Sequence, residues 1–179
     1  MRRGEVVAGT RTALVTGASK GIGRCYALQL AELGYNVLMV SLTISDLAKT
    51  ATEVAKVNNK VWVRYLCKDM ATMTAAEELF AWTEQEGIKI DVLINNAQAS
   101  ASGVTLADHT TEQFDLAVYS GLYATFYYMK ACYPYLKESK GSVINFASGA
   151  GLFGNYGQCA YAAAKEGIRG LSRVAATEW

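Results

Sequence analysis

Three residues in the last third of the chain carry side chains that can move a proton to or from an oxygen atom. Tyr161 and Lys165 lie four residues apart in the segment Y-A-A-A-K, and Ser148 ends the apolar run V-I-N-F-A-S thirteen residues before Tyr161. Residues four apart share one face of a helix, so the lysine ammonium can lie beside the phenol. A positive charge there favours the phenolate, which makes tyrosine a usable acid or base near neutral pH. Because a serine hydroxyl can donate a hydrogen bond to the same substrate oxygen, the trio predicts chemistry at a carbonyl or an alcohol.

A second set with the same spacing, Ser120, Tyr133 and Lys137, lies upstream. Ser120 and Tyr133 are predicted to share one long helix, whose rise of ~1.5 Å per residue separates them by roughly 20 Å. Ser148 instead ends a predicted strand, and a glycine-bearing loop leads from it back to Tyr161. This geometry favours the Tyr161 set as the chemical one, with an accident of helix packing as the alternative.

A glycine-rich turn, T-G-A-S-K-G-I-G at residues 16–23, lies between a predicted strand and a predicted helix. Gly17, Gly21 and Gly23 allow a sharp turn and a close approach of a ligand to the backbone. The helix N-terminus presents free N–H groups and the positive end of its dipole, where a pyrophosphate binds well. The spacing differs from the commoner G-x-G-x-x-G. The turn predicts a nucleotide cofactor, with a tight structural turn as the alternative.

The second predicted strand ends at Ser41, without the carboxylate that would bind the adenosine ribose of NAD. Lys20 stands just before the second glycine of the turn, where its charge could meet a 2′-phosphate. The hydroxyls of Ser41 and Thr43 could add donors. These residues favour NADP over NAD, although Lys20 is equally compatible with an ordinary solvated lysine.

Short apolar runs alternate with longer amphipathic stretches, which predicts a doubly wound α/β domain with a parallel sheet between two layers of helices. The predicted strands are residues 12–16, 36–41, 61–67, 91–95 and 142–147. The predicted helices are residues 22–33, 45–57 and 72–86, a long helix from a Thr110/Gln113 capping box to Pro134 or slightly beyond, and a last helix from about Tyr156 to the end.

The composition indicates one globular domain over residues 1–179, since the hydrophobic share is 51% and the charged share 18%. The net charge of +1 gives no sign of nucleic acid or of an anionic membrane as a partner. No apolar stretch is long enough to span a bilayer, and the first residues lack an apolar signal core, so we expect a cytoplasmic protein. The four cysteines are scattered and His109 is alone, which argues against a metal site.

In these motifs and their order, the chain resembles the short-chain dehydrogenase/reductase family over nearly its whole length. The resemblance implies a Rossmann-type fold that binds NAD(P) and transfers hydride between the nicotinamide and a substrate carbonyl carbon. It implies that Tyr161 is the acid/base, that Lys165 binds the nicotinamide ribose and favours the phenolate, and that Ser148 polarises the carbonyl. Asp69 resembles the residue that contacts the adenine amino group, and N-N-A at residues 95–97 resembles the motif that ends the fourth strand. The expected cofactor-binding residues are Gly17, Ser19, Lys20, Gly21, Ile22, Gly23, Ser41, Asp69, Met70, Asn95, Ala97, Tyr161 and Lys165.

The chain departs from the family pattern at three places. Gln98 stands where the family has the glycine of N-N-A-G, and Gly121 stands where it has an asparagine that holds a water in the proton path to the lysine. The sequence also stops at Trp179 inside the last helix, whereas the family continues with two more strands. We therefore expect the fifth strand to be an exposed sheet edge and the last strands of the fold to be missing. These departures leave a truncated, catalytically inactive nucleotide- or partner-binding fragment as the alternative function.

Another alternative is a nucleotide-sugar epimerase or dehydratase, which also uses Tyr-x-x-x-Lys, but the turn G-x-x-G-x-x-G typical of that class is absent. Association of subunits is also expected. Five apolar residues of the long helix, namely Phe114, Val118, Leu122, Phe126 and Met129, recur at spacings near four, which one buried face would explain. The additional tyrosines 119, 123, 127 and 128 predict a second face that is free for a partner. The resemblance implies a homodimer or homotetramer through this helix and the helix that carries Tyr161.

Overall fold

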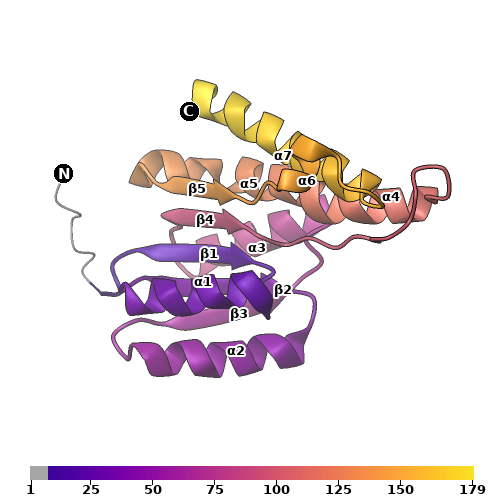
Figure 1. Cartoon of the computed structure of the whole chain (residues 1–179). Helices are drawn as coiled ribbons and strands as arrows, with labels where there is room; N and C mark the ends of the chain where they lie inside the picture. Colours follow the sequence, from indigo (N-terminus) through magenta and orange to yellow (C-terminus); the bar gives the residue numbers. More distant parts are fainter. Residues whose placement is uncertain (1–7) are drawn as a thin grey trace.

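Five parallel strands form the centre of the molecule, in the order β3-β2-β1-β4-β5 (Figure 1). The computed structural model describes residues 8–179, so the first residues of the expected domain, including the segment without a signal core, lie outside the described residues. The strands are β1 (Thr12–Thr16), β2 (Asn36–Ser41), β3 (Val63–Cys67), β4 (Val92–Asn95) and β5 (Ser142–Asn145). All neighbouring strands pair in parallel, which brings their carboxyl ends to one side of the sheet. The predicted doubly wound fold is confirmed.

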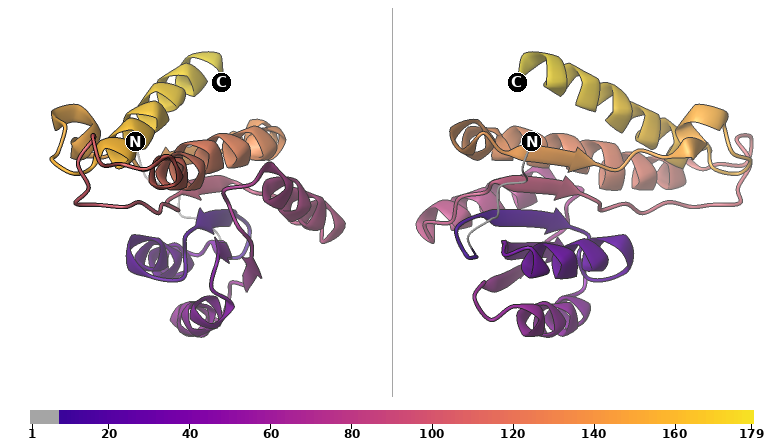
Figure 2. Two further views of the ribbon diagram at one scale, coloured as in Figure 1. Left: turned by 90° about the vertical axis from the view of Figure 1, so that its right-hand side faces the viewer. Right: turned by 60° about the vertical axis from the view of Figure 1, so that its left-hand side comes forward.

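Helices cover both faces of this sheet (Figure 2). Two of them, α1 (Gly21–Glu32) and α2 (Ile44–Val57), pack on one face, while α3 (Met73–Gln85) and α5 (Ala124–Ser139) pack on the other. Successive residues of a strand point to opposite faces, so each strand contributes to two cores. In β1, Leu14 belongs to the core beneath α3 and α5, and Val15 belongs to the core beneath α1 and α2. Both residues are fully buried.

The predicted long helix is continuous but contains a wide turn. It consists of α4 (Thr111–Ala117), the π-helical turn η1 (Val118–Tyr123) and α5, which runs past Pro134 to Ser139. The predicted capping box is present, because Thr110 Oγ1 accepts a hydrogen bond from the backbone N–H of Gln113 at 3.2 Å. A π turn adds a residue to the helical repeat and rotates the face that follows. Phe114 and Phe126 are both exposed, whereas Met129 is buried, so the apolar residues of the long helix do not share one buried face.

The tyrosines of this helix do not form a single exposed face, which corrects the prediction for Tyr128. Tyr128 is fully buried and packs edge-on against Phe80, with ring centroids 6.2 Å apart. Tyr119 and Tyr123 are exposed and stack on each other with a centroid separation of 4.8 Å. The surface that remains free for a partner is therefore smaller than the sequence predicts.

The last helix begins later than predicted. The chain first forms the short helix α6 (Gly149–Phe153), and α7 runs from Cys159 to Glu178. The side chain of Ser148 caps α6 by accepting a hydrogen bond from the N–H of Ala150. Gly154 and Gly157 have positive φ angles of 68° and 66°, which a right-handed helix does not accommodate, so one helix cannot run through the segment.

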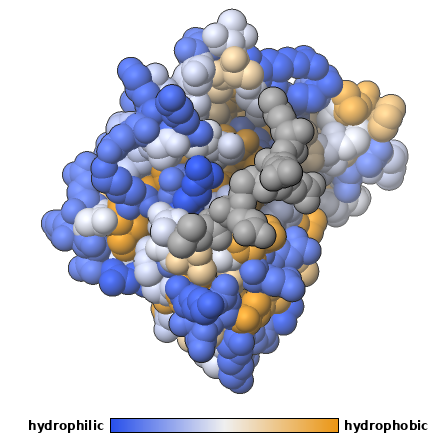
Figure 3. All heavy atoms as spheres, turned by 90° about the vertical axis from the view of Figure 1, so that its left-hand side faces the viewer, coloured by the Kyte–Doolittle hydropathy of each residue, from blue (hydrophilic) through white to orange (hydrophobic). Residues whose placement is uncertain are grey.

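Within residues 8–179, one side of β5 has no neighbouring strand, as the sequence predicts. Beside this edge, residues of α5, β5 and α7 line a groove of about 1010 Å³. Ile144 is 40% exposed there, although it lies in the middle of a strand. The face at the amino ends of the strands is largely hydrophilic, with separate hydrophobic patches (Figure 3). No helix within residues 8–179 combines the length and apolar character that a membrane span needs.

Candidate active site

The glycine turn connects β1 to α1 at the carboxyl side of the sheet. Gly17 and Gly21 have φ angles of 65° and 56°, which favour glycine. Gly23 is required for a different reason, because a Cβ atom at this position would lie 2.4 Å from the carbonyl oxygen of Gly17. The turn therefore lies tightly against the first turn of α1. That arrangement leaves the helix N-terminus open to an anion, as pyrophosphate binding requires.

Hydrogen bonds from the segment after β4 hold the glycine turn. The side-chain amide of Asn96 donates to the carbonyl oxygens of Thr16 and Gly17, at 3.1 and 3.2 Å. In return, Thr16 Oγ1 accepts from the N–H groups of Asn96 and Ala97. Sequence analysis did not include Asn96 among the site residues. The sequence could have indicated Asn96, because it is the second asparagine of N-N-A and directly follows β4. The strand β4 pairs with β1, which leads into the glycine turn.

A cavity of about 540 Å³ opens beside the turn. Nine of the thirteen expected cofactor-binding residues line it, namely Gly17, Ser19, Lys20, Gly21, Ile22, Ser41, Asp69, Met70 and Ala97. Of the expected residues, Gly23, Asn95, Tyr161 and Lys165 lie outside this lining, as does Ser148. Asn95 points instead into the sheet, where its amide donates to the Asn145 side chain at 2.9 Å.

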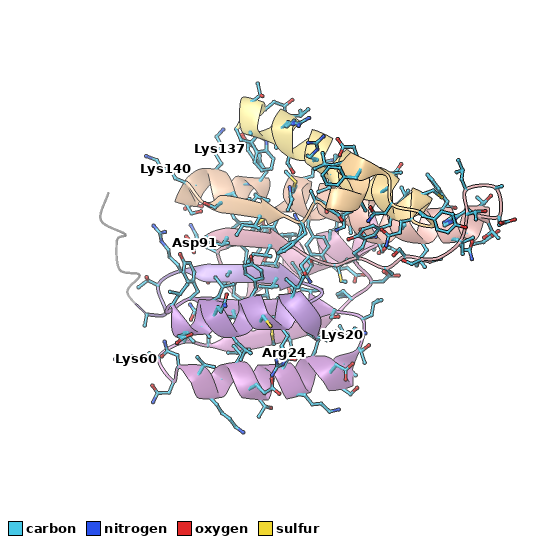
Figure 4. The ribbon with its side chains drawn as sticks, viewed as in Figure 1. Lys20, Arg24, Lys60, Asp91, Lys137 and Lys140 are labelled. Carbon is cyan, nitrogen blue, oxygen red and sulfur yellow. The ribbon has the colours of Figure 1, made fainter. Side chains whose placement is uncertain are left out.

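The lining of the cavity combines one cation, one carboxylate and several hydroxyls. Lys20 and Asp69 are the two charged residues in its lining. Lys20 is exposed and lies at the end of α1 nearest the carboxyl side of the sheet (Figure 4). The hydroxyls of Ser19 and Ser41 are buried and lie 2.9 Å apart. Asp69 Oδ1 accepts from the N–H of Ala71 at 3.0 Å, which holds that carboxylate at the rim.

Lys165 is buried between α7 and the end of β5. Only 3% of its surface is exposed, and its Nζ atom donates to the carbonyl oxygen of Phe146 at 2.8 Å. The same Nζ atom lies 5.6 Å from the centroid of the Tyr161 ring, within the range of a cation–π contact. Burial lowers the pKa of Lys165 to about 8. The predicted pairing of Tyr161 with Lys165 is thus present, with the ammonium held by the backbone.

Ser148 lies two residues beyond Phe146, at the start of α6. The two helices α6 and α7 pack closely, since a Cβ atom at Gly151 would lie 3.2 Å from the carbonyl oxygen of Ala162 and from the N–H of Glu166. Ala162 and Glu166 directly follow Tyr161 and Lys165 in the chain. The helix α6, which Ser148 caps, therefore packs against the part of α7 that carries the other two residues.

The alternative set has a similar pair in a different environment. Lys137 Nζ lies 5.9 Å from the Tyr133 ring centroid, but Lys137 is exposed. Ser120 and Tyr133 lie on the continuous helical run from α4 to α5, as predicted. Burial and the backbone anchor thus distinguish Lys165 from Lys137, whereas sequence spacing alone does not.

Gln98 and Gly121, the two residues that differ from the family pattern, lie side by side in the structure. A Cβ atom at Gly121 would lie 2.1 Å from Gln98 Oε1, so the glutamine side chain occupies the room of a side chain at position 121. Both residues lie next to Ser120, which lines the cavity together with Gln98.

Comparisons with known proteins agree on one family. The family described as short chain dehydrogenase matches residues 11–179. A 12alpha-hydroxysteroid dehydrogenase of Clostridium sp. is 53% identical over 175 residues, which cover 94% of this chain and 67% of that protein. The crystal structure of levodione reductase superposes with a TM-score of 0.89 at 29% identity, covering 96% of this chain and 67% of that one. An NAD+-bound xylitol dehydrogenase gives a TM-score of 0.87 at 27% identity, with 95% and 65% of the two chains covered.

Proposed function

This chain belongs to the short-chain dehydrogenase/reductase family, and we propose that it is an NADP(H)-dependent oxidoreductase that interconverts a carbonyl and an alcohol. The observation that carries the proposal is the environment of Lys165. Its ammonium is buried, anchored to Phe146 and directed at the ring of Tyr161. A tyrosine beside a fixed positive charge is suited to proton transfer at a substrate oxygen.

Each residue of the trio has a proposed role. In reduction, the phenol of Tyr161 gives its proton to the carbonyl oxygen, and in oxidation it takes the proton back from the alcohol. Ser148 donates a hydrogen bond to the same oxygen and orients it. Lys165, whose lowered pKa of about 8 leaves it mostly protonated at pH 7, keeps a positive charge beside the phenol. The nicotinamide, when bound, supplies or accepts the hydride.

The cavity beside the glycine turn supports NADP as the preferred dinucleotide. Ser41 ends β2 where a carboxylate would favour NAD, and it lines the cavity next to Lys20. The exposed ammonium of Lys20 can pair with a 2′-phosphate, and a carboxylate in place of Ser41 would repel that group. Measured dissociation constants for NADPH and NADH test this preference. Tighter binding of NADH would overturn it.

The experiment that tests the activity follows the loss of reduced-nicotinamide absorbance with a panel of ketones. The panel begins with a keto steroid, because the 53% identical relative is named a hydroxysteroid dehydrogenase. We expect Tyr161→Phe to lower the rate by roughly 10²–10⁴-fold while NADPH still binds. The matched control is Tyr133→Phe, which removes the hydroxyl of the half-buried tyrosine beside the exposed Lys137 and should leave the rate unchanged. Full activity in Tyr161→Phe would remove Tyr161 from its proposed role.

A second candidate function is a nucleotide- or partner-binding protein without turnover. Gly121 favours this alternative, because it stands where the family has an asparagine that holds a water in the proton path to the lysine. Binding of NADPH without reduction of any ketone of the panel would support it.

We further propose association through α5 and α7, in the cytoplasm. Phe126 is 41% exposed on α5, and Val174 is 53% exposed on α7, so both helices present apolar side chains to solvent. Sedimentation at high concentration tests the proposal, and a monomer under all conditions would contradict it.

A further inference from the structure

We propose that Gln98 is a positioning residue, whose carboxamide holds the wide helical turn η1 against α7 and thereby sets the place of Lys165. Only the expected effect of Gln98 on catalysis, through Lys165, rests on the proposed function. The structural coupling between residues 98 and 121, which reaches Lys165, can be tested without any turnover.

The amide of Gln98 bonds to the residue that directly precedes η1 and to its own neighbour in the loop after β4. Nε2 donates to the carbonyl oxygen of Ala117 at 3.0 Å and to that of Ala99 at 2.8 Å. It also lies 3.4 Å from Ser120 Oγ, which accepts from the N–H of Ala99. A π turn departs from the regular hydrogen-bond ladder of the helix, so a donor from outside can stabilise the carbonyl that precedes it. Gln98 supplies that donor from the loop after β4.

This set of partners fixes the orientation of the carboxamide. Ala117 and Ala99 present carbonyl oxygens, which accept only, so the NH₂ group must face them. Oε1 is then directed at Gly121. It is buried, and among residues 8–179 no hydrogen-bond partner reaches it. A buried amide whose two ends have such different neighbours cannot rotate without losing its bonds to Ala99 and Ala117.

Glycine at position 121 is required by this arrangement. A Cβ atom there would lie 2.1 Å from Oε1 and 2.7 Å from Cδ of Gln98. Gly121 is buried and its φ angle lies outside the left-handed region, so the backbone itself would accept a side chain. A side chain at 121 can enter only if Gln98 moves, and that movement breaks the bond to Ala117.

Contacts on the other side of η1 carry the effect to the trio. Leu122 of η1 packs directly on Gly167 of α7, where a Cβ atom would lie 2.7 Å from Leu122 Cδ2. Gly167 follows Lys165 by two residues in α7. The side chain of Lys165 is restrained, because its Nζ atom donates a hydrogen bond to the carbonyl oxygen of Phe146. A shift of η1 therefore pushes on the segment of α7 that holds the ammonium.

The test is a double-mutant cycle with three readouts: the melting temperature, the dissociation constant of NADPH, and the titration of the Lys165 ammonium by NMR, assigned with Lys165→Arg. We expect Gly121→Ala to lower the melting temperature and to weaken NADPH binding at least fivefold, which is the effect expected when two residues in contact are coupled. We also expect the titration of the Lys165 ammonium to move upward, toward the ordinary lysine range. Gly170→Ala is the matched control, because nothing lies within 4 Å of a Cβ atom at that helical glycine.

The rescue variants separate space from hydrogen bonding. Gln98→Gly with Gly121→Ala restores the space only, whereas Gln98→Gly with Gly121→Asn also provides an amide from the helix. We expect the asparagine pair to return NADPH binding and the Lys165 titration closer to wild type than the alanine pair does. Equal behaviour of the two pairs, additive effects across the cycle, or an unmoved Lys165 titration in Gly121→Ala would overturn the inference. If wild type binds no NADPH, the proposed function fails, while the melting and titration cycles still decide the role of Gln98.

Discussion

The glycine turn and the reactive trio lie in regions of opposite character. Around the turn, β1 and β2 are buried at every position, and helices cover the sheet on both faces. The trio lies beside β5, which has a neighbour on one side only, and beside α6, where Phe153 is 81% exposed and Tyr156, just beyond the helix, 84%. Under the proposed function, dinucleotide binding depends on the sheet interior, whereas contacts to a substrate depend on elements at the sheet edge. Substitutions near the turn should therefore lower stability and dinucleotide binding together.

The largest effect is expected from Gly23→Ala. Its Cβ atom would lie 2.4 Å from the Gly17 carbonyl oxygen and 2.6 Å from Asn96 Nδ2, so the turn must open. We expect a loss of about 3 kcal/mol in the free energy of unfolding, the upper part of the range for overpacked sites, together with loss of NADPH binding. Urea denaturation and dinucleotide titration check this. In the control Gly170→Ala, where the added methyl group is unopposed, stability should rise by up to ~1 kcal/mol.

Lys165 sharpens the comparison, because it is a buried charged residue beside the open sheet edge. Its folded-state pKa of about 8 lies below the value of an unfolded lysine. The unfolded state therefore binds the proton more tightly than the folded state does. Burial of the charged ammonium lowers the free energy of unfolding by its full amount below pH 8, and this penalty disappears as the pH rises toward ~10.4. Relative to Lys165→Met, wild-type stability should rise by about 2 kcal/mol between pH 8 and pH 10.

The comparison with Lys165→Met is needed because other buried groups titrate in the opposite sense. Burial raises the pKa of the Cys132 thiol and of the Tyr128 phenol. Both groups therefore lower the free energy of unfolding as the pH rises above the pKa that each has in the unfolded chain. Subtraction of the two stability curves removes these contributions. A difference curve that is flat from pH 8 to pH 10 would show that Lys165 is not desolvated in the folded protein.

Asn96→Ala should produce a smaller effect of the same kind as Gly23→Ala. The substitution removes donors to the carbonyl oxygens of Thr16 and Gly17, and a net cost of about 1–2 kcal/mol is expected for two partly buried hydrogen bonds. NADPH binding should weaken with it, because the glycine turn loses its brace. Asn155→Ala, which removes a surface bond to Gln158, is the control and should change neither quantity. Lower stability with unchanged NADPH affinity would separate the turn from the dinucleotide.

The regions also differ in how far the sequence predicts them. The strands of the sheet interior are short apolar runs with turn residues at both ends, and their predicted bounds agree with the structure to within two residues. The alternation of strand and helix predicts the parallel sheet, whereas the order β3-β2-β1-β4-β5 was not predicted. Near the trio, the sequence missed α6, because the glycine-bearing segment looks like a loop until the Ser148 cap and the positive φ angles of Gly154 and Gly157 are known.

The other features that the sequence could not predict depend on contacts between residues that are far apart in the chain. Gln98 and Gly121 are individually unusual, but their mutual fit depends on the wide turn η1, which no periodicity indicates. Tyr128 directly follows Tyr127, so it lies about 100° further around α5, where it is buried. The pairing of Tyr161 with Lys165 was predictable from spacing, whereas the burial that distinguishes it from Tyr133 and Lys137 was not.

The smallest effect is expected from Phe153→Ser, at the exposed end of α6. The ring is 81% exposed, so its replacement removes little buried apolar area, and we expect a change within about 0.5 kcal/mol. Phe80→Ser is the matched variant in the sheet interior, where the ring is 6% exposed, and we expect a loss of about 3 kcal/mol or more. Urea denaturation of both variants measures the contrast directly. A comparable loss in Phe153→Ser would mean that α6 is covered in solution, by a second copy or another partner, and that the edge region is not as open as the isolated chain shows.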